Sequence, residues 1–239
     1  MIWNELKFFL TRLKGLNVSK SITLGEGGGF CVSTGCDIES WVWYPERVVD
    51  SETVERAKEF FRDNKISFMW PVYDGGEKIL EDCGLLYAGS LTAMSYEPGN
   101  SSDTRGLDDA PVNPKEWAET AWHGFGGGAD DVPANYYKLV ESFNADPAFT
   151  LHAHKTEGRY DGTFMLAEEE SVVGVYYVAT VPEMRRRGVA TSMLSRICAL
   201  ARGRTLVLQA TPTGLPLYKK FGFKELFKIP VYSDVSEVF

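Results

Sequence analysis

The sequence predicts an α/β (α+β) fold in which a mixed, mostly antiparallel sheet is flanked by helices. Apolar, β-branched runs such as Val172 to Val178 are typical of buried strands. Other segments, such as Ser192 to Leu200, repeat apolar residues at helical spacing. Between residues 149 and 181 three strand-like runs follow one another across short turns, which favours an antiparallel meander.

Length and composition limit the class of protein. With 239 residues, the chain can form one large domain or two of ordinary size. Its 44% hydrophobic and 24% charged residues are typical of a soluble globular protein. The formal net charge of −8 argues against a general nucleic-acid binder, because such a protein needs a basic surface. An acidic surface is compatible with a cationic amine substrate.

From the pattern of charged and apolar residues we expect no signal for export or membrane insertion. Charged side chains interrupt the apolar N-terminal segment at Glu5, Lys7 and Arg12, so it is no signal peptide. No apolar run reaches the roughly 18 residues of a membrane span. Paired CxxC spacing is missing among the four cysteines, Cys31, Cys36, Cys83 and Cys198. We therefore expect neither a disulfide framework nor a zinc site, and a cytoplasmic location.

The N-terminal elements follow from periodicity and turn residues. Residues 2–14 are predicted to form an amphipathic helix. Gly25 to Gly29 predicts a hairpin turn, because no Lys-Ser/Thr follows it as a phosphate-binding P-loop would require. Ser51 or Thr53 is expected to cap the next helix. The remaining elements are strands at 41–44, 66–72 and 91–96 and helices at 54–62 and 79–84.

Residues 97–114 have the composition of a linker, with Pro98-Gly99-Asn100-Ser101-Ser102 at its start. We therefore predict two domains, residues 1–105 and 106–239. In the second, two helices at 114–122 and 135–143 precede the meander. A helix at 192–200 and strands at 206–209 and 223–232 complete it.

A phosphate site is predicted where the strand ending near Ala179 gives way to a basic loop and a helix that begins at Gly188. The first NH groups of a helix have no partner within it, and the helix dipole adds partial positive charge there. Glycine lets an anion approach this backbone closely. The arginines at 185–187 add charge, so the stretch is typical of a pyrophosphate site.

Two motifs in this region resemble those of one superfamily. Arg185-x-x-Gly188-x-Ala190 resembles the acyl-CoA signature, Arg/Gln-x-x-Gly-x-Gly/Ala, of the GNAT N-acetyltransferases. Leu217 to Phe223 resembles their late helix-to-strand segment, in which a tyrosine precedes a Gly-Phe pair. The resemblance covers residues 106–239. It implies a GNAT-type sheet and acetyl-CoA as co-substrate, with no metal.

The resemblance also implies which residues hold the acyl donor. The pantetheine arm would bond to backbone groups of Val178, Ala179 and Thr180 in the gap between the fourth and fifth strands. Thr211 stands where many members have an asparagine facing the cofactor. The pyrophosphate would take the backbone amides of Arg186, Arg187, Gly188, Val189, Ala190 and Thr191.

In these enzymes the amine attacks the thioester directly, so side chains must remove a proton from an ammonium and return one to a thiolate. We expect Tyr218 to be the general acid; the alternative is a tyrosine packed beside Phe221 and Phe223. The base is not identified, because Gly174 and Leu206 stand where other members have an acid. Two alternatives for the base remain open: a water chain and a residue of the first half.

Other candidates have weaker support. The glycine-rich stretch Gly124 to Asp131 is either a lid over the acceptor site or a connection without a role. His152 and His154 point to the same face of a strand, but a metal there would lack an obvious third ligand. His123 could contact substrate or simply pack on its helix.

The order of elements repeats after 138 residues, which places Gly84 on Gly222 and Leu80 on Tyr218. We infer two GNAT-like halves in tandem, although two unrelated α/β domains could match by coincidence. In the first half Arg47 to Glu52 replaces the phosphate loop, without its glycine and with two carboxylates. That half should bind no CoA and serve as a structural partner or a wall of the substrate cleft.

The sequence thus predicts an N-acetyltransferase that moves an acetyl group from acetyl-CoA to a primary amine, with Tyr218 as general acid. The amine could belong to a small molecule or a peptide. The alternative is a non-catalytic acyl-CoA-binding or protein-interaction module of the same fold. We expect no nucleic-acid or membrane partner, and a monomer or homodimer. A second alternative is a P-loop or dinucleotide-binding enzyme, and the absence of GxxxxGK[ST] and GxGxxG argues against both.

Overall fold

Two compact units share the chain, and neither is one continuous stretch of sequence. The first unit comprises 1–6, 94–208 and 216–225, and the second comprises 7–93, 209–215 and 226–239. The structure, a computed structural model, describes residues 2–45, 49–72, 75–99, 111–128 and 131–236. The boundary expected between residues 105 and 106 lies outside the described residues, so the division into 1–105 and 106–239 stays a prediction.

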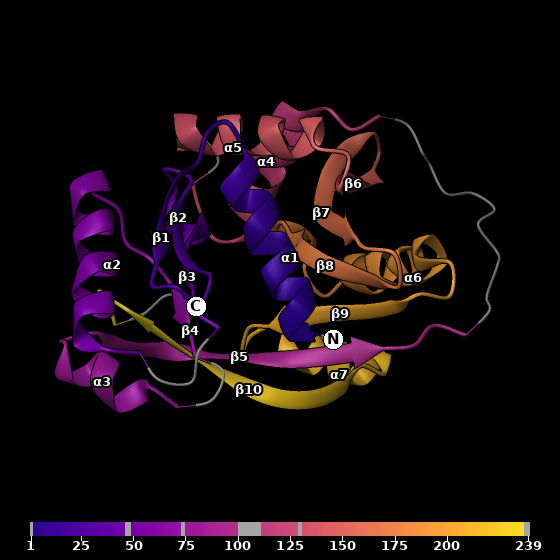
Figure 1. Cartoon of the computed structure of the whole chain (residues 1–239). Helices are drawn as coiled ribbons and strands as arrows, with labels where there is room; N and C mark the ends of the chain where they lie inside the picture. The colour runs from indigo at the N-terminus through magenta and orange to yellow at the C-terminus, as the bar shows by residue number, and fades with distance from the viewer. Residues whose placement is uncertain (1, 46–48, 73–74, 100–110, 129–130, 237–239) are drawn as a thin grey trace. The chain divides into compact units, whose positions relative to one another are not determined.

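The first unit is built on a mixed sheet in which β6 (Phe149–Thr156), β7 (Arg159–Glu168), β8 (Val172–Thr180) and β9 (Thr205–Ala210) are neighbours. β6, β7 and β8 pair antiparallel, whereas β8 and β9 pair parallel. The meander is drawn in orange shades in Figure 1. The predicted mixed, mostly antiparallel sheet is therefore confirmed.

Helices cover both faces of this sheet. α4 (Pro114–Gly124) approaches β8 so closely that a β-carbon on Gly124 would lie 2.8 Å from Ala179 Cβ. The residue after Ala179 is Thr180, which pairs with Gly162 on β7. A β-carbon added to Gly162 would lie 2.9 Å from the Val189 side chain. Val189 begins α6 (Val189–Ala201). Because successive strand residues face opposite sides, α4 and α6 lie on opposite faces. α5 (Ala134–Ala145) packs beside α4 (Figure 1).

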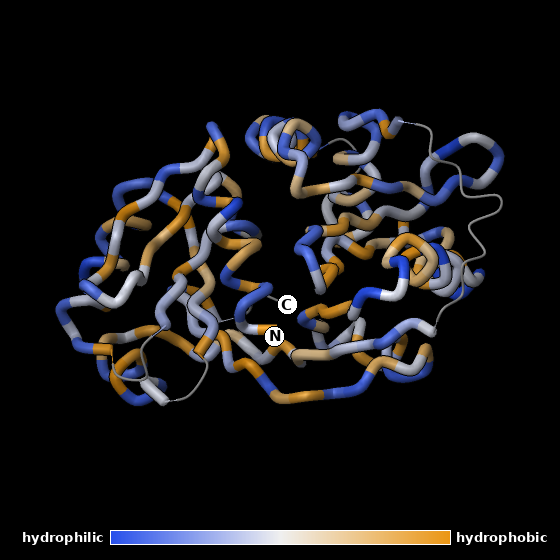
Figure 2. Tube along the Cα trace, turned by 45° about the vertical axis from the view of Figure 1, so that its right-hand side comes forward, coloured by the Kyte–Doolittle hydropathy of each residue, from blue (hydrophilic) through white to orange (hydrophobic). Residues whose placement is uncertain are grey.

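The second unit contains an antiparallel sheet of β1 (Lys20–Leu24), β2 (Gly29–Ser33) and β3 (Ser40–Trp43). Its other elements are α2 (Ser51–Asn64), β4 (Trp70–Pro71), α3 (Glu77–Asp82), β5 (Leu86–Tyr96) and β10 (Lys224–Ser233), the last two shared with the first unit. Figure 2 shows hydrophobic residues recurring between hydrophilic ones along helices and strands. The buried ones form a core that includes Val54, Phe61 and Leu80.

Three local expectations for this unit can be compared with the structure. The turn at Gly25 to Gly29 joins β1 to β2, as predicted. The strand expected at 66–72 is limited to β4, Trp70–Pro71. The cap expected from Ser51 or Thr53 is wrong: Asp50 caps α2, and Ser51 is the first helical residue. The Asp50 carboxylate accepts a hydrogen bond from Thr53 N at 2.7 Å, as an N-cap does.

The 138-residue repeat also appears in the backbone hydrogen bonds. α3 and α7 (Leu215–Phe221) both end at a glycine with positive φ, Gly84 at 81° and Gly222 at 114°. Each end is closed by the same pair of bonds. At the end of α3, Leu85 N donates to Leu80 O (2.9 Å) and Gly84 N donates to Glu81 O (2.9 Å). At the end of α7, Phe223 N donates to Tyr218 O (3.0 Å) and Gly222 N donates to Lys219 O (3.1 Å).

α1 (Ile2–Gly15) completes the fold and confirms the predicted N-terminal helix. Its residues 2–6 belong to the first unit and the rest to the second. Within the described part of the chain, every helix is too short or too polar to span a bilayer.

Candidate active site

The start of α6 has the geometry of an anion site. Gly188 is its N-cap, with φ 89° and ψ −3°, and no side chain caps the helix. The first helical bond is donated by Ser192 N to Gly188 O at 2.9 Å. The amides of Val189, Ala190 and Thr191 precede it and so have no acceptor inside the helix. No atom would lie within 4 Å of a β-carbon on Gly188, so the approach to this backbone is open.

The three arginines before Gly188 have different surroundings. Arg185 donates from Nη2 to Gly124 O at 2.9 Å and from Nε to Thr180 O at 3.2 Å. It therefore ties the end of α4 to the end of β8. Arg186, which has a positive φ of 62°, and Arg187 are exposed. These two side chains leave positive charge at the open side of the loop.

β8 separates from β9 before it ends. Their parallel pairing runs from Val172 with Thr205 to Gly174 with Val207, whereas β8 continues to Thr180. Over this later stretch the strand pairs described for β8 are with β7. A strand edge that has lost its neighbour can hydrogen-bond an extended ligand. Val178, Ala179 and Thr180 lie on this stretch, next to the loop that leads to α6.

β8 is also irregular at this point. Its register with β7 shifts between Thr163 and Met165, and Tyr177 has a positive φ of 53°. Such a backbone is strained for a residue other than glycine, and bulges that re-aim a strand are frequent near functional sites. Thr163 Oγ1 donates to Tyr177 O at 3.1 Å, and the Tyr177 ring packs against Trp117 at 5.5 Å. These contacts hold the bend in place.

Tyr218, the expected general acid, lies in α7 and is 9% exposed. Its ring packs edge-on against Phe223, with ring centres 5.5 Å apart. Burial raises the pKa of the Tyr218 hydroxyl well above its ordinary value. The tyrosine is thus packed against an aromatic neighbour, and it holds its proton at neutral pH.

Thr211 belongs to the second unit, whereas the site residues described above belong to the first. Its backbone oxygen accepts from Gly214 N at 3.1 Å and from Leu215 N at 3.0 Å. Its Oγ1 lies 3.2 Å from Gly214 N. These bonds shape the turn that begins α7, and any role toward a ligand stays a prediction.

The histidines of β6 have ordinary packing partners. His152 stacks on Phe164 at 4.7 Å, and its carbonyl accepts from Trp117 Nε1 at 2.8 Å. His154 Nδ1 lies 2.6 Å from the buried Asp161 carboxylate, which also accepts from a threonine hydroxyl. Among the described residues, no three potential ligands gather as a metal site would require.

The stretch expected to form a lid is partly described. His123 lies at the end of α4, with Nδ1 3.2 Å from Gly127 O and Nε2 3.3 Å from the Glu183 carboxylate. A β-carbon on Gly127 would overlap the Trp122 indole, at 2.0 Å from Nε1, so only glycine fits there. Residues 129 and 130 lie outside the described residues, and the lid stays a prediction.

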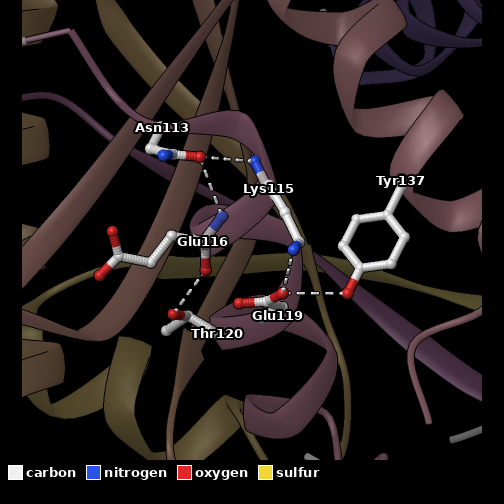
Figure 3. Close-up of polar contacts among 6 residues, drawn as sticks. All are labelled: Asn113, Lys115, Glu116, Glu119, Thr120 and Tyr137. Carbon is white, nitrogen blue, oxygen red and sulfur yellow. Dashed lines mark hydrogen bonds and ion pairs between the residues drawn. The ribbon is translucent and has the colours of Figure 1, made fainter. Parts of the chain in front are cut away.

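The two helices that the resemblance assigns to the acceptor are joined by polar contacts (Figure 3). Asn113 Oδ1 caps α4 by accepting from Lys115 N at 3.0 Å and Glu116 N at 3.2 Å. Tyr137 of α5 donates to Glu119 Oε1 of α4 at 3.1 Å. Burial and this carboxylate raise the pKa of Tyr137. The bond fixes α5 against α4.

The structure adds a pair that the sequence did not suggest. Glu5, in the first turn of α1, is 1% exposed, and the Tyr176 hydroxyl lies 2.8 and 2.9 Å from its two oxygens. A β-carbon on Gly174 would lie 1.9 Å from Glu5 Oε1, so this carboxylate fills the space in front of the glycine. One sequence signal points to Glu5, although not to its partner. Glu5 interrupts the apolar stripe of α1, three residues after Ile2.

The first half differs at the position equivalent to Gly188. The 138-residue shift puts Asp50 there, and both residues are N-caps of equivalent helices. The Asp50 carboxylate bonds to Thr53 N, and this bond lowers the pKa of Asp50. The amino end of α2 therefore already holds an anionic group, which supports the prediction that the first half binds no CoA.

Comparison with known proteins agrees with this geometry. Residues 150–225 match the model of the acetyltransferase (GNAT) domain. A comparison with curated proteins gave no match. Among solved structures, the chain is similar to a GCN5-related N-acetyltransferase from Kribbella flavida, with 18% identity and a TM-score of 0.66 over 98% of this chain and 95% of the other.

Two further structures resemble the chain over most of its length. One is a tandem GNAT protein from the clavulanic acid biosynthesis pathway, at 11% identity and a TM-score of 0.58, covering 91% of this chain and 83% of that one. The other is a GCN5-related glucosamine N-acetyltransferase region of a fungal multi-domain β-N-acetylglucosaminidase, at 12% and 0.60, covering 95% of this chain and 34% of that one. Residues 150–225 thus match the GNAT domain in sequence, and the chain as a whole has the fold of these solved structures.

Proposed function

We propose that this protein is an N-acetyltransferase that transfers an acetyl group from acetyl-CoA to a primary amine. One observation carries the proposal: the open, uncapped start of α6 at Gly188 adjoins a stretch of β8 that has left its neighbour β9. The first feature suits a pyrophosphate, and the second suits an extended chain of amides. CoA has both parts, a pyrophosphate followed by the amide-containing pantetheine arm.

In this proposal each part of the donor has a partner. The amides of Arg186, Arg187, Gly188, Val189, Ala190 and Thr191 take the pyrophosphate, and backbone groups of Val178, Ala179 and Thr180 take the pantetheine arm. Thr211 offers one further hydroxyl. Bound acetyl-CoA supplies an activated thioester, so the amine can attack it directly and no covalent enzyme intermediate is needed.

Tyr218 is proposed as the general acid for the departing thiolate. Its raised pKa keeps the phenol protonated at neutral pH, as a proton donor requires. The same shift makes each proton transfer less favourable than from an ordinary tyrosine. A hydrogen bond to the thiolate would have to offset part of this difference.

A non-catalytic acyl-CoA-binding or protein-interaction module is the alternative. It is favoured by Gly174 and Leu206, which stand where the resemblance places an acid. If the protein binds acetyl-CoA but acetylates no amine, the module is the correct assignment.

The test is a calorimetric titration of the full chain with acetyl-CoA, with CoA and ATP as controls, followed by acetylation assays. Suitable amines are glucosamine, tyramine, spermidine and a peptide with a free N-terminus. Glucosamine is included because one similar structure is named for that activity. Acetyl-CoA binding with turnover of any of these amines supports the proposal. A folded protein that binds neither acetyl-CoA nor CoA contradicts it.

A further inference from the structure

We infer that Glu5 and Tyr176 form the proton acceptor for the amine, with the Tyr176 hydroxyl contacting the amine and Glu5 acting through it. This inference rests on the proposed acetyl transfer. An alkyl ammonium must lose a proton before its nitrogen can attack a carbonyl, so the reaction needs a base. Glu5 comes from the N-terminal helix and supplies the carboxylate that β8 itself lacks.

The Glu5 carboxylate is buried and accepts a hydrogen bond from the Tyr176 hydroxyl. Glu5 is almost fully buried, and a buried carboxylate is unfavourable unless it is hydrogen-bonded. The Tyr176 hydroxyl lies within 2.9 Å of both of its oxygens, so its single proton is shared between them. Tyr176 itself is half-buried. It can therefore connect the enclosed carboxylate with a ligand beside β8.

Gly174 is required by this arrangement. A β-carbon at that position would lie 1.9 Å from Glu5 Oε1 and 2.7 Å from Tyr176 Cε2. Any other residue would push away both members of the pair. The glycine thus creates the space in which a carboxylate from α1 reaches the face of β8.

The pair also lies at the correct end of the proposed donor site. Pairing between β8 and β9 stops at Gly174, and Tyr176 is two residues into the separated stretch. Tyr176 precedes Thr180 by four residues, about 13 Å along a strand. A donor whose phosphates bind at Gly188 and whose arm follows β8 back from Thr180 would bring its thioester toward Tyr176.

The proton transfer can be written with all atoms balanced. An N–H bond of the ammonium breaks, the electron pair stays on nitrogen, and the proton passes to Tyr176 Oη. The original Oη proton passes to the Glu5 carboxylate, so tyrosine is again a neutral phenol. The neutral nitrogen then attacks the thioester carbonyl with its electron pair, and the C–S bond breaks. The thiolate takes a proton from Tyr218. The second proton that the nitrogen loses on becoming an amide passes through water to the Tyr218 phenolate, which restores the phenol. Glu5 releases its proton to water after the product leaves.

The experiment compares the full-length wild type with the variants Glu5→Gln, Glu5→Asp and Tyr176→Phe. Glu81→Gln is the matched control, because Glu81 also accepts a tyrosine hydroxyl, from Tyr232 at 2.8 Å, but belongs to the second unit. Each protein is assayed for thermal unfolding, acetyl-CoA affinity and acetylation of the four amines from acidic to alkaline pH. Aniline is added because it is uncharged at neutral pH.

We expect Glu5→Gln and Tyr176→Phe to bind acetyl-CoA as the wild type does, with kcat lower by about 100-fold. The wild-type rate should rise with pH as the carboxylate ionises, and Glu5→Gln should lose this rise. Glu5→Asp should keep it, since it keeps the carboxylate. The loss should be smaller with aniline, which has no ammonium proton to remove. Glu81→Gln should behave as the wild type.

Several results would overturn the inference. A folded Glu5→Gln protein with the wild-type rate and pH profile excludes the proton role. If Glu5→Gln does not fold, Tyr176→Phe decides: an unchanged pH profile overturns the inference, and a lost rise supports it. A wild type that binds acetyl-CoA and acetylates no amine overturns the proposed function together with this role. An active wild type with unaffected variants overturns this role alone.

Discussion

Replacing Gly188 by aspartate should weaken acetyl-CoA binding at least tenfold while the protein stays folded. The residue has φ 89° and ψ −3°, and a side chain in such a left-handed conformation costs about 1–2 kcal/mol. An aspartate at an N-cap gains back about 0.5–1 kcal/mol from the free amides and the helix dipole. No atom lies within 4 Å of the new β-carbon. The net destabilisation of about 1 kcal/mol corresponds to a Tm lower by about 2–4 °C.

The effect on binding should be much larger. A carboxylate at position 188 would accept one of the free amides of Val189, Ala190 or Thr191, as Asp50 accepts Thr53 N in the first half. Each lost hydrogen bond to a charged phosphate weakens binding by about 1.5–3 kcal/mol. At about 1.4 kcal/mol per tenfold, affinity should fall at least tenfold, and repulsion between the anions adds to this.

Calorimetric titration with acetyl-CoA and a thermal unfolding curve measure the two effects separately. Gly188→Ala has the backbone strain without the charge and should keep most of the affinity. Gly203→Asp is the second control, because Gly203 also has a positive φ, 81°, but follows the other end of α6. It should lower stability without weakening binding. If Gly188→Asp binds acetyl-CoA as tightly as the wild type, the pyrophosphate does not bind at the start of α6.

Three further predictions concern single residues. Tyr218→Phe should lower kcat by about 100-fold at unchanged acetyl-CoA affinity. Because burial raises the pKa of Tyr218, ionisation of this hydroxyl should not lower the wild-type activity in mildly alkaline solution. A variant as active as the wild type would show that Tyr218 is not the acid. Asp50→Ala should lower the Tm at neutral pH, because it removes the bond to Thr53 N. That bond lowers the pKa of Asp50, so the stabilisation is present above the unfolded-state pKa and is lost as pH falls through the folded-state pKa. The unfolding curves of the two proteins should therefore converge in acid. Gly124→Ala should destabilise the fold by about 1–3 kcal/mol, because its β-carbon would lie 2.8 Å from Ala179 Cβ; an unchanged denaturation midpoint would mean that α4 is not held against β8 there.

Local patterns were enough to predict most elements. The alternation and apolar runs of β8 and the helical spacing of α6 are properties of short segments, and both elements form where expected. The phosphate loop could be recognised for the same reason, since a helix start and its glycine are adjacent in sequence. Boundaries were less certain, as the N-cap of α2 at Asp50 shows. Several nearby polar residues could have capped that helix.

The strand expected at 66–72 shows a second limit. Its residues are apolar enough for a strand, but only Trp70 and Pro71 form β4, paired with Val231 and Tyr232 of β10. A strand exists only where a partner backbone accepts its hydrogen bonds. That partner comes from the far end of the chain.

The sequence by itself determined the order of helices and strands, the glycine at the start of α6 and the repeat of the helix-to-strand turn at Gly84 and Gly222. Each of these depends on residues close together in the chain. Only the tertiary structure decided what fills the space at Gly174. Glu5 and Tyr176 are 171 residues apart, and neither has a pattern that points to the other. Their contact exists because packing brings the first turn of α1 against β8, and packing between distant segments is not written in any short stretch of sequence.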